Sequence, residues 1–418
     1  MTEQEFVTKI ESIKGKAYLV GGAIRDLVLG RKPKDRDYVI TGINKNEFEL
    51  IFNNPERVGN SFPVYLIEID KGLCEVAFAR RERKHGIGYK GFKVEFTPDI
   101  SIEEDLFRRD TTMNSMAFQL PERILIDPFN GKKDIQSKII RATSEHFVED
   151  PVRALRVARQ ACQLGFSINE VTYDYMNKCK EELIKEPSER YFKELEKALK
   201  SDRPSLFFKY LNKANLLEVV YPEIYNLIGK THSEVHHPEG DAFNHSMEIL
   251  DFVSKYSDNI ITRFSALVHD IGKGVTPLEL LPHHYKHEQK GLEVLDDWNK
   301  RMVFPVKWMK SAKWIIKNHM KLPVMKGKGK IVGLLIEADK LPIDLEEISL
   351  ILFADRTNSG RRDSELPVYL QTGYINGLVD MLKSVKCENI PDTLSGKQIG
   401  EWLLNKRVKV FEEWLDKF

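Results

Sequence analysis

The sequence predicts an α+β fold in two parts, a small head of mixed strands and helices followed by a long, all-helical body. Short segments rich in β-branched and aromatic residues, bounded by Gly, Asp or Pro, are confined to the first ~140 residues. From Asp150 onward, apolar residues recur at the spacing of amphipathic helices, and strand-like segments become rare. The 418 residues, 42% of them apolar and 30% charged, suit a soluble globular protein of about two to four domains.

Each element is expected from its local pattern. The expected strands are AYLV (17–20), DYVI (37–40), VYLIEI (64–69), CEVAFA (74–79) and ILID (124–127). The expected body helices include VRALRVARQACQLGF, YFKELEKALK, FFKYLNKANLLEVV and FNHSMEILDFV. Asp150 followed by Pro151 predicts a helix start, with Asp150 as the N-cap and Pro151 as the first helical residue.

The composition predicts the cellular compartment of the protein but does not predict a binding partner. Sixty-four basic and 63 acidic residues leave a net charge of +1, from which no nucleic-acid partner can be read. No apolar run approaches the ~18 residues that span a bilayer, and the N-terminus lacks the apolar region of a signal peptide. The four cysteines contain no CxxC pair and encode neither a zinc ribbon nor a disulfide framework. We therefore expect a cytoplasmic protein that does not bind membranes.

The head carries a pair of glycines directly after its first expected strand. Gly21 and Gly22 open a helix that is expected to end near Gly30. Glycines at such a turn allow close approach of a ligand to the backbone, and a helix N-terminus favours a phosphate. A pair of glycines is also common in turns that bind nothing, so this feature alone leaves both interpretations open.

Two carboxylates, Asp35 and Asp37, stand one residue apart where the second strand begins. In a strand, residues i and i+2 point to the same face, so both carboxylates are expected to aim at one spot. Adjacent carboxylates repel each other unless a cation lies between them, and Mg²⁺ held by carboxylates and substrate phosphates suits this arrangement. The alternative is an exposed turn without a metal.

The order of motifs gives the head a family resemblance. GGAIRD followed by DRD resembles the nucleotidyltransferase superfamily that includes DNA polymerase β. RRDTTMNSMA (108–117), IDPFNGKKDI (126–135), EDPVRALRVARQ (149–160) and PSERYFKELEKAL (187–199) follow in the order of class II CCA-adding tRNA nucleotidyltransferases and their poly(A) polymerase relatives. The resemblance covers nearly the whole chain. It implies a polymerase β-like nucleotidyltransferase head, with Mg²⁺ as its cofactor and the tRNA 3′ end, CTP and ATP as its partners.

The resemblance also implies roles for individual residues. Asp35 and Asp37 would be the catalytic, Mg²⁺-binding carboxylates, and Glu75 on a neighbouring strand would be a third metal ligand. Residues matching the nucleotide-binding motifs are Gly22, Arg25, Arg109, Asp110, Glu149, Asp150, Arg153, Arg156 and Arg159. Within this set, Glu149, Asp150 and Arg153 would act as an amino-acid template that selects CTP and then ATP. The segment from Ala79 to Phe92 resembles the flexible loop that family members need to switch from C to A addition.

The three arginines after Pro151 support a nucleotide role independently. Arg153, Arg156 and Arg159 are three residues apart, so each lies ~60° further round the expected helix. The stripe drifts toward the apolar face, and a partly buried arginine needs an anion, which triphosphate oxygens or base acceptors would supply. The alternative is a set of salt bridges to acids of the head.

A second candidate site lies in the helical body. His269 and Asp270 are adjacent at an expected helix end, and His245, His287 and Asp355 lie on either side of them in the sequence. Imidazoles with carboxylates suit a divalent transition metal such as Mn²⁺, Ni²⁺ or Zn²⁺. The motif HDIGKG with these flanking residues resembles the HD phosphohydrolase superfamily. His319 and either His283 or His284 are possible further ligands.

Head and body together resemble the bifunctional bacterial CCA proteins. That subgroup implies phosphatase, 2′-nucleotidase and 2′,3′-cyclic phosphodiesterase activities at the HD site. The boundaries that we predict are 1–140 for the nucleotidyltransferase head, 141–205 for a helical neck, 206–345 for the HD-containing body and 346–418 for a helical tail. The alternatives are a poly(A) polymerase, a partial CC- or A-adding enzyme, and a tRNA-binding protein whose catalysis is only hydrolytic. We expect a monomer or a homodimer.

Overall fold

The computed structural model describes residues 1–58, 63–84, 92–232, 240–358, 364–386, 388 and 394–418. They form two compact units, each described here by itself. The N-terminal unit is Met1–Pro187 with Lys213–Val219, and the C-terminal unit is Ser188–Asn212 with Val220–Phe418. Strands occur in the first and helices fill the second, so the predicted α+β head and helical body are confirmed.

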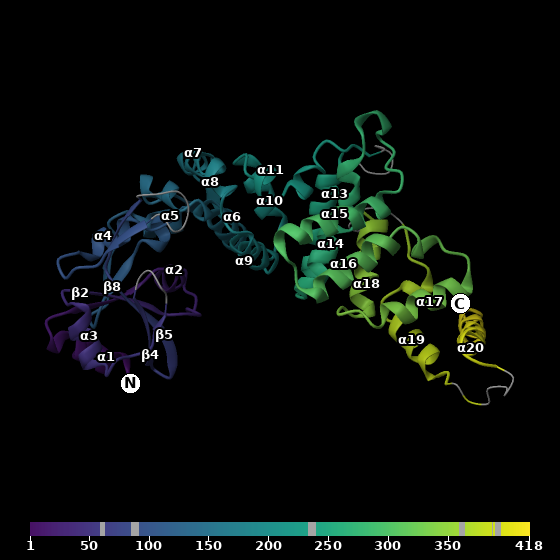
Figure 1. Cartoon of the computed structure of the whole chain (residues 1–418), viewed down its shortest axis with the longest axis horizontal. Coiled ribbons are helices and arrows are strands. Elements are labelled where there is room, and N and C mark those ends of the chain that lie inside the picture. Colours follow the sequence, from purple (N-terminus) through teal and green to yellow (C-terminus); the bar gives the residue numbers. More distant parts are fainter. Residues whose placement is uncertain (59–62, 85–91, 233–239, 359–363, 387, 389–393) are drawn as a thin grey trace. The chain divides into compact units, whose positions relative to one another are not determined.

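The N-terminal unit is built on a seven-stranded sheet, ordered β3-β4-β5-β2-β1-β8-β9 (Figure 1). Its strands are β1 Lys16–Val20, β2 Asp37–Thr41, β3 Arg57–Val58, β4 Val64–Ile69, β5 Gly72–Phe78, β8 Ala117–Gln119 and β9 Ile124–Ile126. Strand β2 pairs with β5 in parallel, and the other neighbouring pairs are antiparallel. The five expected strands are therefore all present. Two smaller pairs join β6 Arg81–Lys84 to β7 Phe92–Glu95, and β10 Ile139–Ile140 to β11 Ser167–Ile168.

Helices cover both faces of this sheet. The helices of the unit are α1 Glu3–Ser12, α2 Gly22–Val28, α3 Lys45–Ile51, α4 Ile102–Phe107, α5 Gly131–Gln136, α6 Val152–Leu164, α7 Glu170–Lys178, α8 Lys180–Leu183 and most of α11 Leu217–Val220, with short 3-10 turns at η1 Thr112–Asn114 and η2 Glu145–Glu149.

Alternation along β2 assigns its residues to opposite faces. Tyr38 contacts Phe6 of α1 on one face, with ring centroids 5.3 Å apart. Val39 packs on the other face with Leu106 of α4. Because side chains alternate in a strand, Asp37 shares the α4 face with Val39. The sheet therefore presents Asp37 toward the segment that follows α4.

The C-terminal unit contains only helices and turns in its described part. Its α-helices are α9 Ser188–Leu199, α10 Ser205–Lys213 (most of it), α12 Pro222–Tyr225, α13 Ala242–Tyr256, α14 Ile260–Val268, α15 His287–Met302, α16 Val306–Asn318, α17 Lys328–Ala338, α18 Leu345–Arg356, α19 Ile375–Ser384 and α20 Lys397–Leu415. Its 3-10 turns are η3 Ile271–Val275, η4 Leu278–Leu280, η5 Leu322–Val324 and η6 Val368–Leu370.

One apolar core runs through the later helices of this unit. Ile249, Ile315 and Leu352 belong to it, and α20 contributes Phe411 and Trp414. The predicted C-terminal helix therefore packs on its own unit. Among the described helices, none has the length and apolar character needed to cross a membrane.

Candidate active sites

The carboxylates of the head come from two adjacent strands. Asp37 is the first residue of β2, and Glu75 lies opposite it in the parallel pairing with β5. Asp35 lies in the loop before β2, so the prediction that it belongs to the strand is wrong. On one side of β2, strand β1 reaches only Val20, which is opposite Asp37, and so offers Asp35 no partner. Asp35 therefore owes its position to the loop.

The like charges around Asp37 disfavour its ionised form. Partial loss of surrounding water raises the pKa of Asp37, the charges of Glu75 and Asp35 add to this effect, and Arg109 opposes it. A divalent cation between the carboxylates would remove the repulsion. In the part of the chain that the structure describes, the head carboxylates do not converge as tightly as the body cluster described below.

Arg36 holds the loop between the two aspartates. Its Nη1 lies 2.8 Å from Oδ2 of Asp70, and its Nη2 donates to the carbonyl of Ile69 at 3.0 Å. Both partners lie at the turn between β4 and β5. Arg36 is thus directed to this turn and fixes the backbone that carries Asp35 and Asp37.

The glycine turn lies against Arg109. Gly21 has a φ of +69°, and a Cβ at this position would lie 3.1 Å from Nη1 of Arg109. The Arg109 guanidinium is held by two hydrogen bonds to Oδ2 of buried Asp105, at 3.2 and 2.9 Å. Glycine is therefore required here for both backbone conformation and space. Arg25 of α2 donates to Oδ1 of Asn114 at 3.1 Å, which connects the turn to the segment after Asp110.

Asp110 is the centre of a buried polar network. Its Oδ1 accepts hydrogen bonds from the Thr111 amide at 2.9 Å and from Nδ2 of Asn114 at 3.0 Å. Its Oδ2 lies 2.9 Å from Nη2 of Arg156. Burial acts to raise the pKa of Asp110, but Arg156 and the hydrogen-bond donors outweigh it and hold the pKa well below its ordinary value. Asp110 therefore joins the segment after α4 to helix α6.

Helix α6 carries the predicted arginine stripe. Arg153 is buried, whereas Arg156 and Arg159 are partly exposed, so the predicted drift of the stripe toward the apolar face is wrong: burial falls along the stripe. Oδ1 of Asp150 accepts a hydrogen bond from the Val152 amide at 3.2 Å. Pro151 already has helical dihedral angles, so Asp150 caps α6 although the helix begins at Val152.

At the start of α6, Arg153 and Glu149 both contact His146. Nη1 of Arg153 donates to the carbonyl of His146 at 2.6 Å, and Nη2 lies 3.9 Å from Oε2 of Glu82 on β6. Oε1 of Glu149 lies 3.0 Å from Nδ1 of His146. Half of the segment that resembles the flexible loop, residues 85–91 of Ala79 to Phe92, lies outside the described residues.

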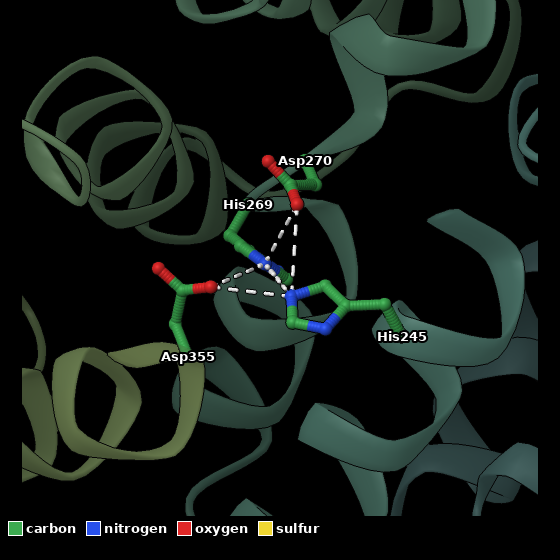
Figure 2. Close-up of side chains that lie close together, drawn as sticks. All are labelled: His245, His269, Asp270 and Asp355. Carbon is green, nitrogen blue, oxygen red and sulfur yellow. Dashed lines mark hydrogen bonds and ion pairs between the residues drawn. The ribbon is translucent and has the colours of Figure 1, made fainter. Parts of the chain in front are cut away.

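Four side chains converge in the C-terminal unit (Figure 2). His245 comes from α13, His269 from the end of α14, Asp270 from the start of η3 and Asp355 from α18. Nε2 of His245 lies 3.2 Å from Oδ1 of Asp355 and 3.3 Å from Nε2 of His269. Their four potential ligand atoms all lie within 4.8 Å of one another, a spacing that suits one divalent cation.

A second group of ligand atoms shares Asp270 with the first. Nε2 of His287 and Nε2 of His319 each lie 3.3 Å from Oδ1 of Asp270. All three residues are buried, and in the described part of the chain Nε2 of His287 and Nε2 of His319 have no hydrogen-bond partner, whereas Asp270 is paired with Lys273. Two sets of donors therefore meet at one carboxylate. The donor set fits divalent cations.

Backbone carbonyls fix the orientation of these imidazoles. Nδ1 of His269 lies 2.7 Å from the Ala266 carbonyl, and Nδ1 of His287 lies 2.9 Å from that of His284. Because a carbonyl only accepts, each Nδ1 carries the proton and, in the neutral ring, leaves the Nε2 lone pair for a cation. Burial acts to lower the pKa of His269, but Asp270 and Asp355 outweigh it and raise that pKa to about 10. The pocket thus attracts positive charge.

Sequence reasoning left several residues of these sites undecided or unseen. His283 is exposed, and His284 bonds to Thr276 and Thr231 and lies outside both ligand groups. Lys273, whose Nζ is 2.5 Å from Oδ2 of Asp270, was not predicted, although its spacing of three residues was visible in HDIGKG. Asp105, the anchor of Arg109, was likewise not predicted.

The network at Asp110 predicts a pH-dependent stability. Asp110→Asn removes the charge opposite Arg156, and we expect a loss of about 2 kcal/mol in the free energy of unfolding at pH 7, because Arg156 remains partly hydrated. The lowered pKa of folded Asp110 means that its contribution is present above the unfolded pKa of ~3.9 and is lost as pH falls below it. Urea unfolding from pH 7 to 3 should therefore show the difference shrinking, with exposed Glu122→Gln as the control. A difference that stays constant with pH would contradict this.

Gly272 predicts a test of the shared ligand cluster. A Cβ on Gly272 would lie 2.0 Å from the His287 carbonyl and 2.4 Å from the Gly291 amide, so Gly272→Ala must push η3 away from α15. We expect this variant to lose at least tenfold in affinity for Mn²⁺ at the cluster, measured by calorimetry. Gly333→Ala, which meets nothing within 4 Å on α17, should bind as the wild type does. Equal affinities for the two variants would refute the proposed close packing.

Three protein-family models match successive parts of the chain. The Poly A polymerase head domain matches residues 17–141, the probable RNA and SrmB-binding site of polymerase A matches residues 165–227, and the HD domain matches residues 242–357. Two solved structures share the fold. They are the Bacillus stearothermophilus CCA-adding enzyme in complex with CTP (TM-score 0.67, 20% identity, covering 99% of this chain and 95% of that one) and the Thermotoga maritima CCA-adding enzyme complexed with tRNA (TM-score 0.64, 22% identity, 97% and 89%).

Curated relatives match over nearly the whole length. The multifunctional CCA protein of Acinetobacter baylyi is 35% identical over 405 residues, which are 95% of this chain and 97% of that protein. The multifunctional CCA protein of Mannheimia succiniciproducens is 36% identical over 408 residues, 94% of this chain and 96% of that protein. The predicted resemblance is confirmed, and the chain belongs to the family of multifunctional CCA proteins, nucleotidyltransferases with an HD domain.

Proposed function

We propose that this protein adds and repairs the 3′-terminal CCA of tRNA, taking CTP and ATP and releasing pyrophosphate without a nucleic-acid template. The observation that carries the proposal is the arrangement in the N-terminal unit. There, Asp37 and Glu75 lie in register on one sheet, and the network at Asp110 connects the glycine turn to the arginines of α6. The relatives favour this function over a poly(A) polymerase.

At the head, Asp35, Asp37 and Glu75 would hold Mg²⁺. The bound ions would neutralise charge at the reacting phosphate and the attacking tRNA hydroxyl. The protein's own task is then to position the triphosphate: the glycine turn allows it to approach the backbone, and Arg25 and Arg109 supply cations beside that turn. Gly22 leaves the room that this approach needs.

Base selection is assigned to the start of α6. Glu149, Asp150 and Arg153 present carboxylate acceptors and guanidinium donors, which can match the Watson–Crick edges of cytosine and adenine. Arg156 and Arg159, further along the helix, would bind phosphate oxygens, and Asp110 fixes Arg156. Burial of Arg153 supports the assignment, because a rigidly held donor selects a base more sharply than a mobile one does.

At the body site, the two ligand groups would hold divalent transition ions such as Mn²⁺ or Ni²⁺. His245, His269, Asp270 and Asp355 would bind one ion, and Asp270, His287 and His319 a second. These ions would supply the Lewis acidity for hydrolysing phosphomonoesters and 2′,3′-cyclic phosphates. Lys273 lies at Asp270, where its ammonium group can bind a phosphate oxygen of the substrate. Phosphatase, 2′-nucleotidase and cyclic phosphodiesterase activities follow from one such site.

The partner is the tRNA 3′ end, and the cytoplasm is the compartment in which tRNA, CTP and ATP meet. Among the described residues, Cys74, Cys162 and Cys179 are buried and form no disulfide, which suits a reducing compartment. A CC-adding or A-adding enzyme remains the alternative within the same chemistry, and the products of the addition reaction distinguish these activities.

Single substitutions should separate the two proposed activities. Asp37→Asn should lower the rate of nucleotide addition at least 10³-fold and leave phosphate release unchanged, because it removes a charge only at the head. His269→Ala should abolish phosphate release and leave addition within twofold of wild type. The assays are incorporation of labelled CMP and AMP into a tRNA transcript and hydrolysis of 2′,3′-cyclic AMP. Addition that survives Asp37→Asn, or hydrolysis that survives His269→Ala, would contradict the assignment.

The shared carboxylate predicts a metal stoichiometry. In an Asp35→Asn/Asp37→Asn background, which silences the head, we expect about two Mn²⁺ per chain, because Asp270 belongs to both ligand groups. His319→Ala should remove one ion and Asp270→Ala both, measured by equilibrium dialysis. His283→Ala is the matched control, since His283 lies outside both groups. One ion in the parent, or one retained by Asp270→Ala, would contradict the shared site.

A further inference from the structure

His284 lies outside both ligand groups of the body, but its backbone holds one of the ligands. Its carbonyl accepts two hydrogen bonds from His287, one from Nδ1 at 2.9 Å and one from the backbone amide at 3.3 Å. Nε2 of His287 lies 3.3 Å from Oδ1 of Asp270, where the second cation is proposed to bind. The direction of this Nε2 therefore depends on the position of the His284 carbonyl.

The side chain of His284 is bound at both ring nitrogens. Nε2 lies 3.0 Å from the Thr231 carbonyl, and because a carbonyl only accepts, Nε2 carries the proton. Burial lowers the pKa of His284 to about 4, so the ring is neutral at pH 7 and its Nδ1 accepts from the Thr276 hydroxyl at 2.9 Å. The ring of His232 packs edge to face against it, with centroids 5.1 Å apart. These contacts hold the imidazole in one orientation.

Both hydrogen-bond partners of the ring have contacts of their own. Thr276 is the C-cap residue of η3, where its amide donates to the Lys273 carbonyl at 3.0 Å and its carbonyl accepts from Nζ of Lys230 at 2.6 Å. Thr231 pairs in a β-bridge with Asp241, the N-cap residue of α13. Both partners therefore keep their places without the imidazole, and it is the segment before α15 that the imidazole fixes to them.

We infer that His284 is a positioning residue for the second divalent cation, an inference that rests on the two-ion site of the proposed function. Its ring ties the segment before α15 to η3, and its carbonyl directs the His287 imidazole. The other two ligands of this group, Asp270 and His319, come from other elements, and Nδ1 of His319 is oriented by carbonyls of its own helix α16 at 3.1 and 3.2 Å. Loss of the His284 ring therefore weakens the second ion and leaves every ligand of the first in place.

The test measures Mn²⁺ binding by equilibrium dialysis in the Asp35→Asn/Asp37→Asn background, in which the parent chain should bind about two ions. His284→Ala removes the ring and keeps the backbone carbonyl. We expect it to raise the dissociation constant of one ion about tenfold and to leave that of the other within twofold. His284→Gln, whose amide can replace the donor to Thr231, should recover most of the affinity. His283→Ala changes the exposed neighbour and should match the parent.

Hydrolysis of 2′,3′-cyclic AMP gives a second readout that a general loss of structure would not reproduce. In the otherwise wild-type chain, His284→Ala should need about ten times more Mn²⁺ for half-maximal activity, because only the affinity of one ion falls. At saturating Mn²⁺ its kcat should lie within twofold of wild type. Thr276→Val removes only the hydroxyl that binds the ring and should change the Mn²⁺ requirement in the same direction. The double variant should resemble His284→Ala, since both substitutions break the same contact.

The outcomes separate this inference from the proposed function. If the parent binds two ions and His284→Ala binds both with unchanged affinity, or weakens both equally, the inference is overturned and the two-ion site stands. If the parent binds fewer than two ions, the two-ion site itself fails and the inference falls with it. Thermal unfolding shows whether each variant stays folded at the assay temperature. Should His284→Ala unfold, Thr276→Val decides, and unchanged affinity for both ions in that variant overturns the inference.

Discussion

The N-terminal site depends on one buried carboxylate. Asp110 is ionised in the core of its unit, and that charge is tolerable only because Thr111, Asn114 and Arg156 surround it with donors. Through Asn114 the network reaches Arg25 at the glycine turn, and through Arg156 it reaches helix α6. The residues that would bind phosphates and those that would read a base are thus fixed relative to each other by one ion pair and its hydrogen bonds.

A complementary constraint governs the places where cations are proposed to act. Asp37 lies opposite Glu75 on two paired strands, and Asp270 and Asp355 lie among four imidazoles. In both places the fold gathers carboxylates with a cationic side chain beside them, Arg109 at the head and Lys273 in the body. The two places offer a cation different ligands. Carboxylates alone favour Mg²⁺, whereas imidazoles mixed with carboxylates favour transition ions. The difference in donor chemistry allows the same chain to carry out transfer and hydrolysis without one metal serving both sites.

Much of the fold could be predicted because it follows from local patterns. The five expected strands and the helix at Asp150 depend on short-range alternation, spacing and capping, which the sequence displays directly. Asp35 was placed wrongly because β1 ends at Val20, opposite Asp37, and the residues around Asp35 do not show where that partner strand ends. Glu75 could be predicted as a neighbour of Asp37 only by resemblance. The sequences of two strands that are far apart in the chain do not show which of their residues pair.

The ligand cluster of the body shows the same limit. The adjacent pair His269 and Asp270 stands out in the sequence, and His287 was preferred to His283 and His284 because of the family resemblance rather than a local pattern. The structure selects His287 because it opens α15 beside η3, where Gly272 and Gly291 permit close packing. The roles of Lys273 and Asp105 were not predicted, because the role of a charged residue can be inferred only when its burial and its partner are known.

The central claim is that side chains at the start of α6, the helix that Asp110 anchors through Arg156, choose the nucleotides without a nucleic-acid template. It is tested most directly by sequencing the ends of tRNA transcripts that stop at the discriminator base, after incubation with the wild-type protein, Mg²⁺ and all four nucleoside triphosphates. The account predicts that C, C and A are added in that order and that addition then stops. A long A tail, or mixed incorporation of U and G, would contradict it.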